Sequence, residues 1–296
     1  MSWYLEDFEQ RKEEFREAAA RIDSKRDPFD VVRSCSPQYS NPSHLLSDIR
    51  EIVGKMRIHA QDYVTLPEGE CCEVGPLPEA SKLDCPTVMY GPKSSSDGQI
   101  VGRMGVNVDN YDAFTRADLW SWCAHECYPG HHTNYAKAAV SQLPASFRLG
   151  MSLSRCLLEG QAHRSEMLMM PYYEDDVARL AAKHRALYTA FEVKAEIDLN
   201  YYGRPHQEIY QAYLEDIRVN EMTARLQVQA HLMHPGDAVC YYSGARVLDE
   251  LRQELNMEQR TYMEAIFSFG SVSLNTMKHL VAMTPNELEG LRKFSV

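Results

Sequence analysis

The chain has 296 residues, of which 44% are hydrophobic and 25% charged, and this balance is typical of a globular protein with a sizeable core. Its formal net charge of −11 argues against nucleic acid as a partner, because phosphate backbones are bound by clustered cations. No run approaches about 18 apolar residues and no signal-peptide pattern opens the chain, so we expect a cytoplasmic protein without a membrane-spanning segment. The eight cysteines are then expected to be free thiols.

The N-terminal part is expected to hold two helices and two loops. Apolar residues recur at helical spacing over residues 2–25 and again from residue 43 to about 64. Residues 26–42 contain Pro and Ser, and residues 67–86 contain several prolines and glycines without a sustained hydrophobic period. Both of these segments are therefore predicted to be irregular.

Two short strands and a series of helices are predicted for the remainder. Residues 87–90 and 100–108 are the best strand candidates, separated by a Gly-Pro-Lys-Ser-Ser-Ser-Asp-Gly turn. Thr115 is a candidate N-cap, after which the helical periodicity is broken mainly at prolines. The predicted helices span residues 116–126, 132–141, 145–170, 174–201, 206–233, 237–254, 257–268 and 271–282.

This pattern predicts a mainly α fold with a small antiparallel β-sheet next to one of the helices. We expect one domain over residues 1–296, in which an N-terminal helix and loop (1–42) precede the core (43–296). A strand near residues 100–107 is expected at the edge of the sheet, where an extended substrate backbone could pair with it.

One stretch is chemically distinctive: residues 122–132 read Trp-Cys-Ala-His-Glu-Cys-Tyr-Pro-Gly-His-His. In the zinc-hydrolase motif His-Glu-x-x-His, two imidazoles one helical turn apart share a metal. Here the next histidines after His125 are His131 and His132. On a continuous helix His131 would lie about 120° around the axis from His125, and His132 about 10 Å along it, so neither could share one metal with His125. Pro129 and Gly130 offer a solution, because they end the helix and allow a tight turn that folds the second imidazole back. We expect a new helix to open near His131.

Together with Glu-Gly-Gln-Ala at residues 159–162 and Pro-Gly-Asp-Ala-Val-Cys-Tyr at residues 235–241, this motif resembles the domain of unknown function family 885. The family motifs read His-Glu-x-x-Pro-Gly-His, Glu-Gly-Trp-Ala and Pro-Gly-Gln-Ala-x-x-Tyr. The family is similar to zinc metallopeptidases with a glutamate ligand, such as the carboxypeptidase Taq group, which implies a helical metallopeptidase-like domain. The resemblance covers roughly residues 45–285 and matches the C-terminal half of typical members, whose longer helical N-terminal part is largely missing here.

The resemblance implies that two imidazoles and one carboxylate hold a zinc ion, namely His125, His131 and Glu159. Glu126, beside His125, would then act as general base, since a carboxylate suits the proton of a metal-activated water. Without a metal, Glu126 is one more solvated acid. The alternative for Glu159 is a surface ion pair with Arg155, four residues earlier.

Other polar residues could support the metal or contact the substrate. Tyr241, in the third motif, could donate a hydrogen bond to the oxyanion of a tetrahedral intermediate, unless it is a core aromatic. On the helix of Glu159, Glu166 could hold a ligand imidazole, whereas a lone histidine such as His163 is more often packed or on the surface. Arg252 could clamp a substrate carboxylate or lie on a solvated helix face.

Four positions leave the choice of ligand or the substrate open. His132 is an alternative ligand to His131, or a donor that supports it. Asn134 stands where the family has Gln and could keep a polar contact with a shorter reach. Gln161 replaces the family Trp, and Asp237 replaces Gln in the third motif. A metal site can survive these changes, whereas the family's substrate preference is in doubt.

The expected function is zinc-dependent hydrolysis of an amide or peptide bond in a peptide or a small metabolite. Two alternatives stay open: an oxygen-dependent enzyme with Fe²⁺ on the same two histidines and carboxylate, and a catalytically inactive structural homologue. A homodimer is a further hypothesis, because a second subunit could cover the surface that the missing N-terminal part would bury. A monomer of 33.9 kDa in solution would contradict it.

Overall fold

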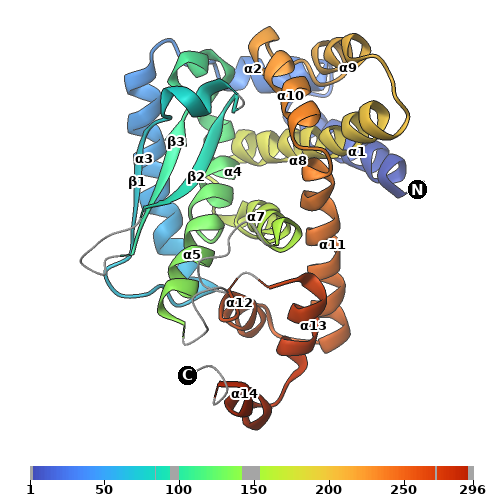
Figure 1. Ribbon diagram of the computed structural model, residues 1–296. Coiled ribbons are helices and arrows are strands. Elements are labelled where there is room, and N and C mark those ends of the chain that lie inside the picture. Colours follow the sequence, from blue (N-terminus) through green and yellow to red (C-terminus); the bar gives the residue numbers. More distant parts are fainter. Residues whose placement is uncertain (1–2, 84, 94–99, 142–153, 271, 293–296) are drawn as a thin grey trace.

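The structure, a computed structural model, describes residues 3–83, 85–93, 100–141, 154–270 and 272–292. Helices make up most of these ranges, with a small sheet beside them (Figure 1). The helices are α1 (Trp3–Ile22), α2 (Pro28–Cys35), α3 (Pro42–His59), α4 (Arg116–Glu126), α5 (His131–Val140), α7 (Arg155–Leu168), α8 (Asp176–Glu196), α9 (His206–Ala212), α10 (Glu221–Met233), α11 (Asp237–Leu255), α12 (Gln259–Phe267), α13 (Leu274–Ala282) and α14 (Pro285–Arg292). The strands are β1 (Cys71–Pro76), β2 (Val88–Lys93) and β3 (Val101–Val106). The predicted mainly α fold with a small sheet is confirmed.

The long helix α8 crosses the middle of the molecule and organises one apolar core (Figure 1). Helix α1 packs along it and buries Tyr4, Phe8, Phe15 and Ala19, which recur at the spacing that predicted this helix. Burying apolar side chains of this size contributes roughly 1.5–3 kcal/mol each. Helix α8 also packs against α4, the first helix of the candidate site.

Helix α7 lies between α4 and α11, and its contact with α11 is close enough to require glycine. A Cβ atom on Gly160 would lie 2.3 Å from the backbone of Gly244. A Cβ atom on Gly244 would lie 1.7 Å from the carbonyl oxygen of Cys156. Because only glycine lacks Cβ, these two positions allow α7 and α11 to touch backbone to backbone.

The sheet has the strand order β1-β3-β2 and is mixed rather than purely antiparallel. Strand β2 pairs antiparallel with β3, as expected, but β1 pairs parallel with β3. Two predictions were therefore wrong: residues 67–86 contain a strand, and the strand near residues 100–107 is central rather than at the edge. Strand β2 is the outer strand beside α4 and α5. Local sequence could not show the parallel pairing, because a short strand without alternation depends on its long-range partner.

Two helical predictions also need correction. Helix α2 lies inside the segment 26–42 that was predicted as a loop, where Asp27 caps the helix and Pro28 occupies its first turn. The predicted helix 206–233 is interrupted at Arg218, whose backbone is left-handed with φ 58°, so that α9 and α10 are separate.

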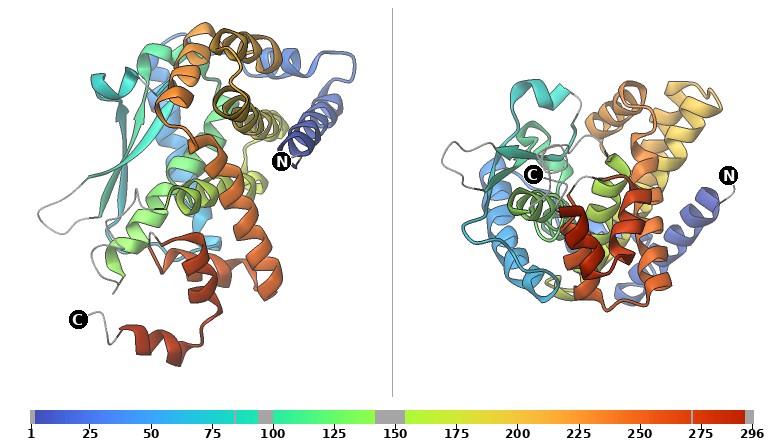
Figure 2. Two further views of the ribbon diagram at one scale, coloured as in Figure 1. Left: turned by 45° about the vertical axis from the view of Figure 1, so that its right-hand side comes forward. Right: turned by 60° about the horizontal axis from the view of Figure 1, so that its bottom comes forward.

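The C-terminal helices α12, α13 and α14 lie together at one end of the molecule (Figure 2). Tyr262, Met263 and Phe267 of α12 are buried in a cluster with residues of α11 and α13. Residues 145–153 of the predicted helix 145–170 lie outside the described residues. None of the helices described is both long enough and apolar enough to span a bilayer.

Candidate metal centre

The end of α4 and the start of α5 bring two candidate ligands together. Helix α4 begins with a capping box at Thr115 and ends at Glu126, as predicted. The peptide bond between Tyr128 and Pro129 is cis, and α5 opens at His131.

Gly130 allows the chain to turn tightly between these two helices. A Cβ atom there would lie 1.7 Å from the carbonyl oxygen of His125. The hydroxyl of Ser165 on α7 donates to the carbonyl oxygen of Pro129 at 3.2 Å and ties the turn to the next helix. The rings of His125 and His131 consequently lie 4.9 Å apart between centroids, at an interplanar angle of 86°.

Glu159 on α7 completes a group of three buried side chains. One ligand atom from each of His125, His131 and Glu159 lies within 4.8 Å of the other two. Glu159 Oε2 is 3.3 Å from Nε2 of both imidazoles. Within the described part of the chain this buried oxygen has no hydrogen-bond partner. Two imidazole nitrogens facing an unsatisfied carboxylate oxygen are the donor set that suits a divalent metal such as zinc.

The electrostatics of the group also favour a bound cation. Burial would raise the pKa of Glu159, but the neighbouring His131, His125 and Arg155 outweigh it and hold the pKa well below its ordinary value. Burial would lower the pKa of His125, but Glu159 and Glu166 outweigh it and raise the pKa to about 10. Glu159 therefore stays ionised, and a buried anion beside two imidazoles is the form that binds a metal cation.

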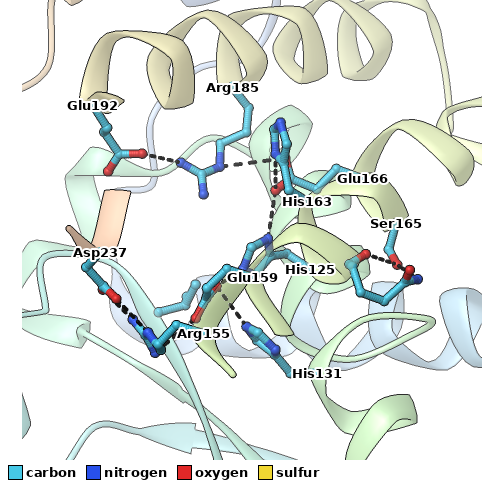
Figure 3. A network of polar contacts seen from close by, with 12 residues as sticks. His125, His131, Arg155, Glu159, His163, Ser165, Glu166, Arg185, Glu192 and Asp237 are labelled. Carbon is cyan, nitrogen blue, oxygen red and sulfur yellow. Dashed lines mark hydrogen bonds and ion pairs between the residues drawn. The ribbon is translucent and has the colours of Figure 1, made fainter. Parts of the chain in front are cut away.

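A chain of charged residues behind His125 fixes the orientation of its ring (Figure 3). His125 Nδ1 lies 2.8 Å from Glu166 Oε1, which also lies 3.4 Å from His163 Nδ1. With a proton on Nδ1, Nε2 is left to face Glu159. Arg185 on α8 continues the chain, with Nε 3.7 Å from Glu166 Oε2 and Nη1 3.7 Å from Glu192 Oε2.

The group lies on the wall of a cavity of about 740 Å³. Glu126 and Tyr241, the residues predicted from the sequence as general base and hydrogen-bond donor, line the same cavity. The ring of Tyr241 stacks on His125 with centroids 5.7 Å apart at 18°. Burial raises the pKa of Tyr241 far above its ordinary value, so its hydroxyl keeps its proton and can donate.

Arg155 and Asp237 close one side of this cavity. Arg155 Nη1 lies 3.0 Å from Glu159 Oε1, so the ion pair that was the alternative for Glu159 is present. Glu159 is nevertheless 4% exposed and not on the surface. Arg155 also binds both carboxylate oxygens of Asp237, at the first turn of α11. The sequence departure at Asp237 thus anchors the arginine that contacts the third candidate ligand.

His132 faces away from the group. Its Nε2 lies 2.7 Å from Glu70 Oε2 and its Nδ1 3.2 Å from the Tyr90 hydroxyl. Glu70 also accepts hydrogen bonds from Tyr128 and Arg57, both at 2.6 Å. The geometry favours His131 over His132 as the ligand, since only His131 shares the space between His125 and Glu159.

Three other predicted site residues do not reach the cavity. Asn134 is buried on α5 but does not line it. Arg252 donates to the carbonyl oxygen of Met257 at 3.3 Å near the end of α11 and does not line this cavity. Gln161 turns toward Met263 instead of the cavity.

The sequence analysis missed Arg185 and Glu192, both of which line the cavity. A signal was available, because these charged residues interrupt the Ala-rich, otherwise buried run of α8 and lie seven residues apart on one helical face. Burial raises the pKa of Glu192 to about 7, although Arg185 and Gln227 act in the opposite direction.

The chain matches the family described as bacterial protein of unknown function (DUF885) over residues 1–281, and it belongs to that family. The match begins at residue 1, which corrects the expectation that only residues 45–285, as a C-terminal half, would resemble it. No curated protein matches the chain.

Two solved structures share the fold. A protein described as "the putative lipoprotein from Colwellia psychrerythraea" is 18% identical with a TM-score of 0.82, over 97% of this chain and 51% of that one. A second, described as "a putative lipoprotein of unknown function from Shewanella oneidensis", is 15% identical with a TM-score of 0.75, over 95% of this chain and 56% of that one. The chain thus spans about half the length of these structures.

Proposed function

We propose that this chain is a zinc-dependent hydrolase of amide or peptide bonds. The proposal rests on one observation: His125, His131 and Glu159 converge on the wall of a cavity. There a buried Glu159 oxygen faces two imidazole nitrogens and has no hydrogen-bond partner among the described residues. Two imidazoles and one glutamate are also the ligands of glutamate-type zinc peptidases such as the carboxypeptidase Taq group.

When bound, zinc would polarise the substrate carbonyl and lower the pKa of a water molecule. The Glu126 carboxylate takes the proton of the attacking water and passes it to the leaving nitrogen. Glu166 holds the proton on His125 Nδ1, which keeps Nε2 free to act as a ligand. The Tyr241 hydroxyl donates to the carbonyl oxygen as negative charge develops on it.

The sheet supports an extended substrate. Val88, Met89 and Tyr90 of β2 line the cavity, and among the described strands β2 pairs with β3 alone. A strand with an unpaired edge beside the catalytic groups can hydrogen-bond to an extended backbone. The substrate-pairing role that the sequence suggested for residues 100–107 is therefore reassigned to β2.

The test combines metal content with turnover. The zinc-loaded wild type is assayed on a mixed fluorogenic peptide library, beside Glu126→Gln and the matched control Glu9→Gln, which lies on the exposed face of α1. Glu126→Gln should keep its zinc and lose about 10²–10⁴ in kcat, whereas Glu9→Gln should keep both.

Two outcomes would contradict the proposal. Iron in place of zinc, with activity that needs oxygen and survives Glu126→Gln, would favour oxygen-dependent chemistry at the same ligands. A zinc-loaded wild type that cleaves no amide would favour an inactive homologue.

A further inference from the structure

Arg185 is a buried cation with two donors, Nε and Nη1, that form no hydrogen bond with the described residues. Arg185 is 8% exposed and lines the cavity. The contacts of its Nε with Glu166 and of its Nη1 with Glu192 are both 3.7 Å, which is too long for hydrogen bonds. Among the residues the structure describes, both nitrogens are buried and without a hydrogen-bond partner. Leaving charged donors unpaired in this way is costly, which marks the position as one that awaits an acceptor.

The guanidinium group is nevertheless held in place. It lies over the ring of Trp122, 3.9 Å from the centroid, and 5.2 Å from the ring centroid of Tyr188. Both aromatic residues also line the cavity. Figure 3 shows the guanidinium between Glu192 and Glu166. Contact with the two rings holds the guanidinium in place without using its hydrogen-bond donors.

Arg155, the other arginine of the cavity, provides a contrast. Its Nε and Nη2 bind the two oxygens of Asp237, and its Nη1 contacts Glu159 at 3.0 Å. Its donors are therefore occupied by the protein itself. Arg185 is the cavity arginine with donors that the described residues leave without an acceptor.

We propose that Arg185 binds a carboxylate group of the substrate, so that the enzyme acts on amides or peptides that carry a carboxylate near the scissile bond. This rests on the proposed function, because it takes the cavity beside the metal ligands as the substrate site. A carboxylate is planar, accepts two parallel hydrogen bonds and matches the guanidinium fork. It can be the C-terminal carboxylate of a peptide or an acidic side chain.

Glu192 is the internal competitor for this position. Its Oε2 is the carboxylate oxygen nearest to Arg185 Nη1, and its Oε1 accepts a hydrogen bond from Gln227. Burial raises the pKa of Glu192 to about 7, so this carboxyl can take up a proton when a second anion arrives beside it. Removing the Glu192 charge should therefore strengthen carboxylate binding.

The experiment measures binding by calorimetry with three probes: N-acetyl-glycyl-phenylalanine, its C-terminal amide, and N-acetyl-glycyl-glutamic acid amide. The first and third carry a terminal and a side-chain carboxylate, and the second carries none. The proteins are zinc-loaded wild type, Arg185→Gln, Arg185→Lys, Glu192→Gln and the control Arg246→Gln. Arg246 is exposed on α11 and pairs with Glu250, so its replacement changes net charge but not the cavity.

The wild type should bind one of the carboxylate probes about 10- to 100-fold more tightly than the neutral amide. Arg185→Gln should abolish this preference, Arg185→Lys should keep part of it, and Glu192→Gln should increase it several-fold. Arg246→Gln should match the wild type. Arg185→Lys keeps the positive charge but not the planar fork, so a reduced carboxylate preference in that variant decides the matter if Arg185→Gln does not fold.

Equal binding of acid and amide by the wild type would overturn the assignment, and so would a preference that survives Arg185→Gln. The latter result would attribute carboxylate binding to the metal. Because binding requires no turnover, a zinc-loaded wild type that binds carboxylates through Arg185 but cleaves no amide would refute the proposed function alone.

Discussion

His131 and His132 are neighbours in the sequence, yet they face two buried carboxylates of different character. His131 faces Glu159, one of whose oxygens is buried without a hydrogen-bond partner within the described residues. His132 faces Glu70, which accepts from His132, Tyr128 and Arg57. Both carboxylates are 4% exposed, so burial does not distinguish them.

The two clusters differ in whether the carboxylate oxygens have hydrogen-bond donors. Burial would raise the pKa of Glu70, but hydrogen bonds from His132 and Tyr128 outweigh it and lower the pKa. The Glu70 cluster is therefore complete and joins the segment before β1 to α3 and α5. The Glu159 cluster has the same residue types with an acceptor left over, and it borders a cavity. An incomplete buried network, rather than a buried His–Glu pair as such, identifies the candidate site.

The largest effect is expected where the two clusters diverge. Gly130→Ala would place a Cβ atom against the His125 carbonyl and push the turn apart. We expect the free energy of unfolding to fall by about 3–4 kcal/mol, with loss of metal, because both clusters depend on this turn. Urea unfolding measures the change. The control Gly54→Ala, with nothing within 4 Å, should stabilise α3 by about 0.5–1 kcal/mol. A tolerated Gly130→Ala with normal zinc content would show that the close turn is unnecessary.

Breaking the complete cluster should affect stability alone. His132→Ala removes one partner from Glu70 and the His132 partner of the Tyr90 hydroxyl, at a cost of about 3 kcal/mol in unfolding free energy. Zinc content should stay at the wild-type level. A loss of less than about 1 kcal/mol would show that the Glu70 cluster contributes little to the fold.

Glu192 offers a third buried carboxylate with the opposite pKa shift. In the metal-free protein its pKa is about 7 when folded against an ordinary value of 4.5. As pH rises, the unfolded state therefore loses this proton before the folded state does. The contribution of protonated Glu192 to stability is complete below pH 4.5 and is lost as pH rises through 7. The difference in unfolding free energy between Glu192→Gln and the wild type should therefore shift by about 2 kcal/mol in favour of the variant from pH 5 to pH 8. A difference that does not change with pH would show that Glu192 ionises normally.

Glu166→Gln should weaken zinc binding without removing a ligand. The neutral amide is a poorer acceptor for the His125 Nδ1 proton, so zinc affinity should fall by about 10- to 100-fold in a chelator competition titration. Glu70→Gln is the same substitution in the complete cluster and should leave zinc affinity unchanged. Equal effects of the two variants would remove the distinction between the clusters.

The local events of the fold could be read from the sequence, whereas long-range pairings could not. Pro129 and Gly130 predicted the turn because their backbone constraints act locally. The choice between His131 and His132 depends on Glu70 and Glu159, which lie 61 and 28 residues from His131 and are brought together only by tertiary packing.

The cavity wall was predictable only in part. Glu126 and Tyr241 belong to motifs and were found, whereas Arg185 and Glu192 carry no motif and depend on how α8 crosses the molecule. For Arg252 the sequence left a substrate clamp and a solvated helix face open, and its position near the far end of α11 does not border this cavity.

The most direct test of the account is zinc content by plasma mass spectrometry, compared between His131→Ala and His132→Ala beside the wild type. We predict near-stoichiometric zinc in the wild type and in His132→Ala, and its loss in His131→Ala. Zinc retained by His131→Ala and lost from His132→Ala would contradict the ligand set. A wild type that binds no first-row metal after reconstitution would contradict the metal site itself.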